Sequence, residues 1–152
     1  MKLLAWMLAI AAAGFLAACA TLPSAPELQL SLNGARQVPP NTSTAAGKAS
    51  FWVHADRTLN GIVETSGMTG TAANLYLGGA GEVGPLVLEL TRTSTDGPMA
   101  MEGAPISGAS WSLPRNARLS DDQYRAYLAG QVYLNVHSER FPQGEIRGQL
   151  SP

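Results

Sequence analysis

Cysteine and histidine are scarce in this chain of 152 residues, which contains one cysteine and two histidines. The single cysteine, Cys19, excludes an intramolecular disulfide and any metal site built from several thiolates. Two imidazoles, His54 and His137, are too few for a copper/zinc pair of the dismutase type. The composition still allows one kind of metal site, in which two histidines and one carboxylate bind the ion, with Glu145 as the third ligand. We expect no metal and no cofactor.

Charge is also sparse, because only 14% of the residues are Asp, Glu, Lys or Arg and the formal net charge is −1. The chain has no basic patch, which excludes the nucleic-acid-binding proteins. Motifs of the common enzyme classes are missing as well: there is no nucleophile elbow, and no helix is expected after the Gly-rich stretch 78–81. Phosphate binding needs backbone N–H groups that converge at the start of a helix. We therefore expect no enzymatic activity.

No apolar run is long enough to span a membrane comfortably, since the longest, residues 3–13 (LLAWMLAIAAA), has the length of a signal-peptide core. Lys2 precedes this run, and Leu16-Ala17-Ala18-Cys19 follows it. The second motif resembles the lipobox of bacterial lipoproteins, in which the cysteine is acylated and becomes the mature N-terminus. The alternative is that Cys19 is an ordinary small residue near the cleavage site of a signal peptide.

The lipobox predicts a division of the chain into a lipoprotein signal peptide (1–18), a lipidated N-terminus and tether (19–27) and a β-domain (28–152). The tether is indicated by its small and Pro-containing composition. Acyl chains on Cys19, palmitate among them, predict a protein anchored in the membrane of a bacterial cell envelope. Ala20, rather than an aspartate, after the cysteine resembles the pattern sent to the outer membrane, with the domain facing the periplasm.

Short apolar or alternating runs with turn residues between them predict an all-β domain, a sandwich or a barrel. Tight turns are expected at Asn60-Gly61 and Asp96-Gly97. The expected strands are 28–32, 48–54, 61–65, 74–78, 85–90, around 105–107, 131–137 and 144–150.

One short helix is expected near residues 121–129. Ser120 and Gln123 have the spacing of a capping box, acidic residues fill the first turn, and Gly130 follows where a helix commonly ends.

Three sequence blocks resemble the CHRD domain, a family first described in chordin and found in microbial secreted proteins. They are LNGARQVPP (32–40), GGAGEVGPLV (78–87) and YLNVHSERFPQGEIRGQL (133–150), and the resemblance covers residues 28–150. It implies an immunoglobulin-like, Greek-key β-sandwich or barrel that is distantly similar to copper/zinc superoxide dismutase, without an established enzymatic activity. Two departures weaken a metal site: Asn74-Leu75-Tyr76 replaces a common His-x-His, and Gln37 replaces a glutamate.

The last block predicts a β-hairpin in which Ser138 lies opposite Gly144. In that register His137 faces Glu145 and Asn135 faces Arg147, so these four side chains form either a polar cross-strand ladder or a ligand site. We favour the ladder, because a slip by one residue would bury the charges. Alternation also predicts a set of buried residues: Phe51, Val53, Leu86, Leu88, Leu90, Leu134, Val136 and Ile146.

Two functions of different class follow. The first is a membrane-anchored, non-enzymatic module that binds an envelope protein or a glycan. The second is a degenerate metal-dependent redox protein. Metal content and dismutase activity discriminate between them.

Overall fold

The computed structural model describes residues 25–94 and 108–152. These residues form an all-β domain with a single α-helix, as the sequence predicts. No helix among them is long and apolar enough to cross a membrane. The elements in chain order are β1 (Glu27–Asn33), the 3-10 helix η1 (Gly34–Arg36), β2 (Ala46–Val53), β3 (Leu59–Ser66), β4 (Gly70–Leu77), β5 (Leu86–Glu89), β6 (Thr91–Ser94), β7 (Ser110–Ser112), α1 (Asp121–Leu128), β8 (Val132–Ser138) and β9 (Ile146–Leu150).

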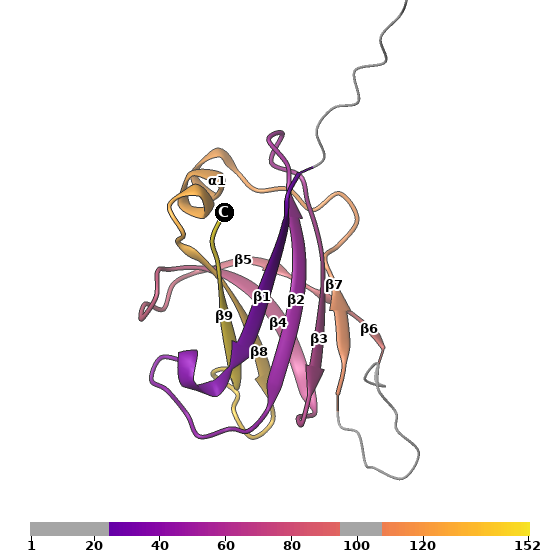
Figure 1. Cartoon of the computed structure of the whole chain (residues 1–152), viewed down its shortest axis with the longest axis vertical. Helices are drawn as coiled ribbons and strands as arrows, with labels where there is room; N and C mark the ends of the chain where they lie inside the picture. Colours follow the sequence, from indigo (N-terminus) through magenta and orange to yellow (C-terminus); the bar gives the residue numbers. More distant parts are fainter. Residues whose placement is uncertain (1–24, 95–107) are drawn as a thin grey trace, which may run out of the picture.

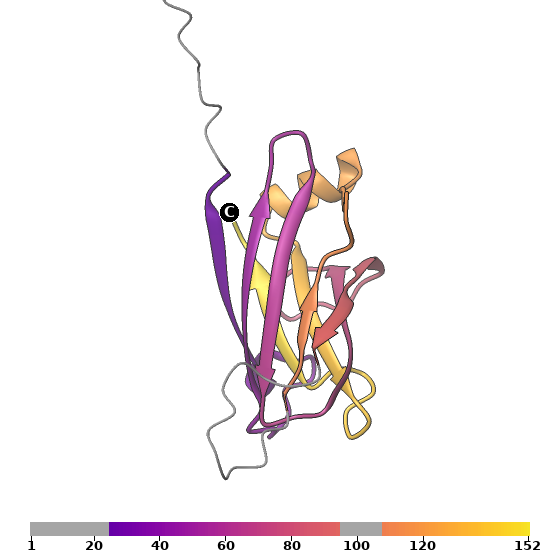
Figure 2. The same ribbon diagram turned by 90° about the vertical axis from the view of Figure 1, so that its right-hand side faces the viewer.

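All strand pairings of the sheet are antiparallel, and the strand order is β5-β4-β8-β9-β1-β2-β3-β7-β6. The two edge strands, β5 and β6, are consecutive in the chain and are separated only by Leu90, whose N–H donates to the carbonyl of Ala73 in β4 at 2.9 Å. The chain therefore runs from one edge of the sheet to the other, and the sheet curls into a nearly closed barrel (Figures 1 and 2).

The core lies inside this barrel and is built from one face of each strand. Phe51 and Val53 alternate with exposed or half-buried neighbours along β2, as period-2 patterning requires. Trp111 of β7 is 1% exposed and is the largest fully buried side chain. Six of the eight predicted core residues are buried, namely Phe51, Val53, Leu90, Leu134, Val136 and Ile146.

The prediction is wrong for Leu86, which is 47% exposed, and Leu88 is only partly buried. A register shift in the β4–β5 pair causes the difference. Leu88 pairs with the buried Leu75, but Leu86 pairs with Tyr76, so Val87 is the extra residue of a β-bulge. Because cross-strand partners share one face of a sheet, Leu86 lies with Tyr76 on the outer face.

The prediction of a turn at Asn60-Gly61 is also wrong, because both residues lie within β3. The turn before β3 is instead made by residues 54–58, where Arg57 has a φ of 72° and its N–H donates to the carbonyl of His54. Gly61 has a packing role: a Cβ at this position would lie 2.2 Å from Cδ1 of Phe51. The glycine therefore leaves room for the aromatic ring.

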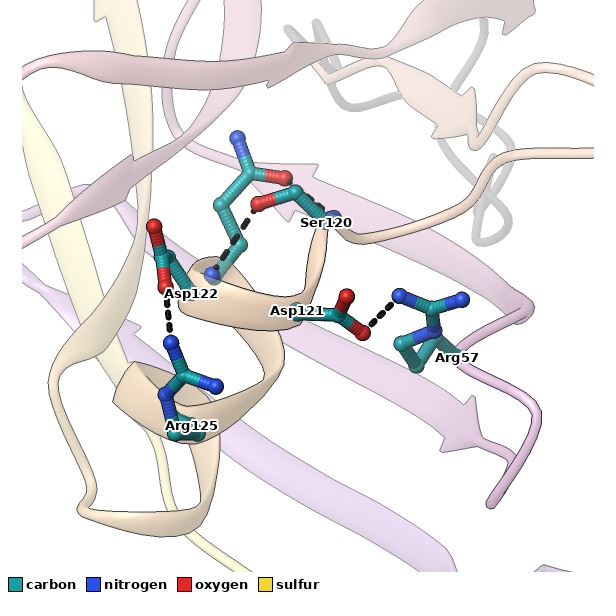
Figure 3. Close-up of polar contacts among 6 residues, drawn as sticks. Arg57, Ser120, Asp121, Asp122 and Arg125 are labelled. Atoms are coloured by element: carbon teal, nitrogen blue, oxygen red, sulfur yellow. Dashed lines mark hydrogen bonds and ion pairs between the residues drawn. The ribbon is translucent and has the colours of Figure 1, made fainter.

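The helix α1 caps one end of the barrel, and its capping box is present as predicted (Figures 2 and 3). The Ser120 hydroxyl accepts from the N–H of Gln123, and the Gln123 side chain accepts from the N–H of Ser120. Asp121 forms an ion pair with Arg57, which joins the helix to the β2–β3 turn (Figure 3). Gly130 has a φ of 69°, the left-handed conformation expected just beyond a helix.

Strands β6 and β7 are not predicted by the sequence, because β6 is polar throughout and β7 has only three residues. The expected strand around 105–107, the turn at Asp96-Gly97, and the signal peptide and Cys19 lie outside the described residues.

Candidate functional site

The β8–β9 hairpin has the predicted register. Asn135 pairs with Arg147, and Tyr133 pairs with Gln149. The turn depends on Gly144, whose φ of 124° suits glycine and whose N–H donates to the carbonyl of Phe141 at 3.0 Å. The apolar residues of the hairpin, such as Val136 and Ile146, point into the core and are fully buried.

The polar face of the hairpin is covered, although it carries charged and amide side chains. Asn135, Glu145 and Arg147 are only 6%, 5% and 3% exposed. Two loops lie over them: the β1–β2 loop (residues 34–45), which includes η1, and the β4–β5 loop (residues 78–85). Both loops lie to the left of β9 in Figure 1. This face is therefore a loop-covered polar layer rather than a solvated surface.

Asn135 is held from two sides by hydrogen bonds. Nε2 of Gln37, from the β1–β2 loop, donates to Oδ1 of Asn135 at 2.6 Å, and both side chains are buried. The Nδ2 group of Asn135 donates to the carbonyl of Gln143 in the hairpin turn at 3.2 Å. The asparagine thus joins a loop from the start of the domain to the hairpin at its end.

Glu145 is bound by the same loop. Its Oε1 atom accepts from the hydroxyl of Ser43 at 2.5 Å, and its backbone carbonyl accepts from Nδ2 of Asn41 at 2.9 Å. Within the described residues, no hydrogen bond or ion pair joins Glu145 to His137 or Arg147. The charged residues of the hairpin share one register, but each of them is bonded to a loop or to β4 instead of to the others.

His137 is part of a chain of hydrogen bonds that starts in β4. Its Nδ1 lies 3.0 Å from the Pro142 carbonyl, and its Nε2 lies 3.1 Å from the Tyr76 hydroxyl. Because a carbonyl only accepts, Nδ1 carries the proton in the neutral ring and Nε2 accepts from Tyr76. The Tyr76 oxygen in turn accepts from Nδ2 of Asn74 at 3.1 Å. The two residues that replace the family's His-x-His thus orient the one histidine of this face.

Arg147 is a buried cation that contacts neutral groups. Its Nη1 donates to the carbonyl of Glu82 at 2.7 Å, and its Nη2 donates to the carbonyl of Gly79 at 2.8 Å. Its guanidinium lies over the ring of Tyr133, with the central carbon 3.5 Å from the ring centroid, a cation–π geometry. Burial lowers the pKa of Arg147, while Tyr133 and Glu82 oppose that shift.

A groove of about 440 Å³ opens beside this guanidinium. Residues 35–38 and Pro40 of the β1–β2 loop form one wall, Ala80 and Gly81 of the β4–β5 loop form the other, and Arg147 and Gln149 lie between them. The lining therefore contains two arginines and no acidic residue. Its volume is within the range of small-molecule sites.

His54 lies apart from this arrangement, just after β2, where its backbone N–H donates to Thr58 and its Nε2 lies 3.4 Å from Nδ2 of Asn60. Across residues 25–94 and 108–152, no three His, Cys, Asp or Glu side chains are grouped so that they hold a metal ion. The alternative site of His54, His137 and Glu145 therefore gains no support from the geometry.

Sequence reasoning identified the hairpin residues but missed the groove and its loops. In the sequence, Gln37 and Tyr76 are only departures from the family pattern, whereas in the structure both are hydrogen-bond partners of hairpin residues. Their contacts join positions 98 and 61 residues apart, a separation that no local periodicity indicates.

Comparison with known proteins agrees with the resemblance of the three blocks. No curated protein and no solved structure matches the chain. The family model of the CHRD domain matches residues 28–150, which include all of the sheet except Glu27 at the start of β1, both loops and the polar layer. The chain therefore belongs to the CHRD domain family.

Proposed function

We propose that this protein is a lipid-anchored binding module of the bacterial cell envelope, without enzymatic activity. Acylated Cys19 holds it in the membrane, with the CHRD domain facing the periplasm from the outer membrane. The anchoring is supported by Leu16-Ala17-Ala18-Cys19 and by the apolar run before it.

Binding, rather than catalysis, is supported by one observation above all. The described part of the chain has a groove whose buried Arg147 forms no ion pair there, whereas it lacks a grouped set of metal ligands. The Glu82 carboxylate attracts this guanidinium without forming an ion pair with it, and because a buried cation without an ion pair is costly, a bound anion would offset the remaining cost. An envelope protein or a glycan is the expected partner class of the whole domain.

Anchoring is tested by labelling cells with radioactive palmitate and separating the membrane fraction. The wild-type chain is expected to carry the label and to sediment with membranes. Cys19→Ser is expected to lose the label, and to be either released from the membrane or left with its signal peptide unprocessed. A matched control combines Cys19→Ser with Ser24→Cys, which restores a thiol outside the lipobox and should stay unlabelled. Label on Cys19→Ser refutes the anchor.

The absence of redox chemistry is tested by metal analysis of the full chain purified in detergent and dialysed against a weak chelator. The proposal predicts copper, zinc and iron far below one atom per chain, and no dismutase activity. Stoichiometric metal together with dismutase activity contradicts it and restores the redox hypothesis.

A further inference from the structure

The groove beside Arg147 has the features of a selective site for one class of ligand. Its lining residues include two arginines, no acidic residue, and apolar residues such as Ala35, Val38 and Ala80. We propose that it binds a small organic acid, with the carboxylate on Arg147 and the apolar body between the two loops. This inference rests on the proposed binding function and adds a small-molecule site to it, beside the protein or glycan partner expected for the whole domain.

The hydrogen bonds of Arg147 leave donors for such a ligand. A guanidinium has five N–H groups. Within the described residues, three bonds are made, to the carbonyls of Glu82 and Gly79 and to Oε1 of Gln149 at 3.4 Å. Two N–H groups therefore donate to no described residue. These two groups, the Nε–H and one N–H of Nη1, lie on opposite sides of the planar guanidinium, so either one can donate a single charge-assisted hydrogen bond to a carboxylate oxygen.

The position of the guanidinium is set before a ligand arrives. The two loop carbonyls and the ring of Tyr133 hold it, and Gln149 is itself fixed, because its Nε2 donates to the carbonyls of Gly78, Gly130 and Val132 at 2.8 to 2.9 Å. A preorganised donor loses little conformational entropy on binding. Its burial, at 3% exposure, also strengthens its attraction for an anion.

The walls favour an apolar body over a highly charged one. Arg36, at the edge of the groove, is exposed, and its Nη1 donates to the carbonyl of Ser31. Of the two arginines that line the groove, Arg147 is therefore the buried one. A phosphate dianion needs more charge and more donors than one partly occupied guanidinium supplies, whereas a monocarboxylate is neutralised by it.

The test uses ¹⁹F NMR of the full chain in a non-ionic detergent with two probes of nearly the same shape, 4-fluorobenzoate and 4-fluorobenzamide. The benzoate is expected to bind saturably, and the neutral amide at least about tenfold more weakly. The phosphonate analogue, 4-fluorophenylphosphonate, is expected to bind more weakly than the benzoate.

Ala80→Phe is the decisive variant, because it fills the groove at an exposed loop position and leaves Arg147 in place. It should weaken benzoate binding at least about tenfold. The control is Ala55→Phe, at an exposed position in the β2–β3 turn outside the groove, which should bind as the wild type does. Unchanged melting temperatures establish that both variants fold.

Equal binding of benzoate and benzamide, or benzoate binding that survives Ala80→Phe, overturns the proposal, as does tighter binding of the phosphonate. These outcomes leave the lipid anchor and the metal analysis untouched. Failure of the ligand class is therefore distinguishable from failure of the proposed function.

Discussion

The hydrogen bond between Gln37 and Asn135 joins the β1–β2 loop to the hairpin, and a double-mutant cycle measures its contribution. Both side chains are buried, and the 2.6 Å contact joins two neutral groups. Asn135→Ala removes that acceptor and also leaves the carbonyl of Gln143 without its side-chain donor. Gln143 is exposed, so the main cost comes from the buried Nε2 group of Gln37, which loses its acceptor; a buried polar group without a partner costs about 1–3 kcal/mol, and the single variant should lose about that much.

The coupling between the two residues is smaller than that loss. A neutral hydrogen bond contributes about 0.5–1.5 kcal/mol net, and this is the expected interaction energy when Gln37→Ala, Asn135→Ala and the double variant are compared. Urea unfolding, with unchanged m-values across the four proteins, supplies the free energies. Strict additivity of the two single variants refutes the reasoning, because it means that the loop is not held by this contact.

Three further substitutions test other parts of the fold. Val136→Ala removes two methyl groups at a fully buried position and should destabilise by about 1–3 kcal/mol in urea unfolding; an unchanged midpoint removes Val136 from the core. Gly61→Ala places a methyl group against Phe51 and should cost about 1–3 kcal/mol, and a neutral result contradicts the close packing there. Burial raises the pKa of Tyr127, and the neighbouring Tyr124 adds to the shift. A raised folded-state pKa gives stability that is full below the unfolded value, about 10, and is lost as pH rises above it. Unfolding free energy measured from pH 9 to 11 should therefore fall for the wild type and fall less for Tyr127→Phe; identical slopes contradict this assignment.

The parts of the structure that follow from local patterns were predictable. Alternation and Gly144 determine the hairpin, because only one register buries Val136 and Ile146 while keeping the polar residues together. Ser120 and Gly130 likewise mark the helix through their own backbone geometry. These signals lie within a few residues of the structure that they determine.

The missed features depend on distant contacts. The sequence does not show that loops cover the polar face of the hairpin, because nothing near Arg147 indicates that residues 79 and 82 lie over it. The exposed position of Leu86 results from a bulge in its pairing with Tyr76, which the apolar run 85–90 conceals. The groove itself forms between two loops whose paths are set by tertiary contacts, and no sequence motif therefore predicts it.

The central claim is that this domain acts by binding, and that its site is the groove beside Arg147. An amide chemical-shift map of the full chain, titrated with 4-fluorobenzoate, tests it most directly. The account predicts that the largest perturbations fall on Ala80, Gly81 and Gln149 and on the Nε–H of Arg147. The account is contradicted if the largest chemical-shift perturbations fall around His54 or in the β2–β3 turn, or if no perturbation saturates.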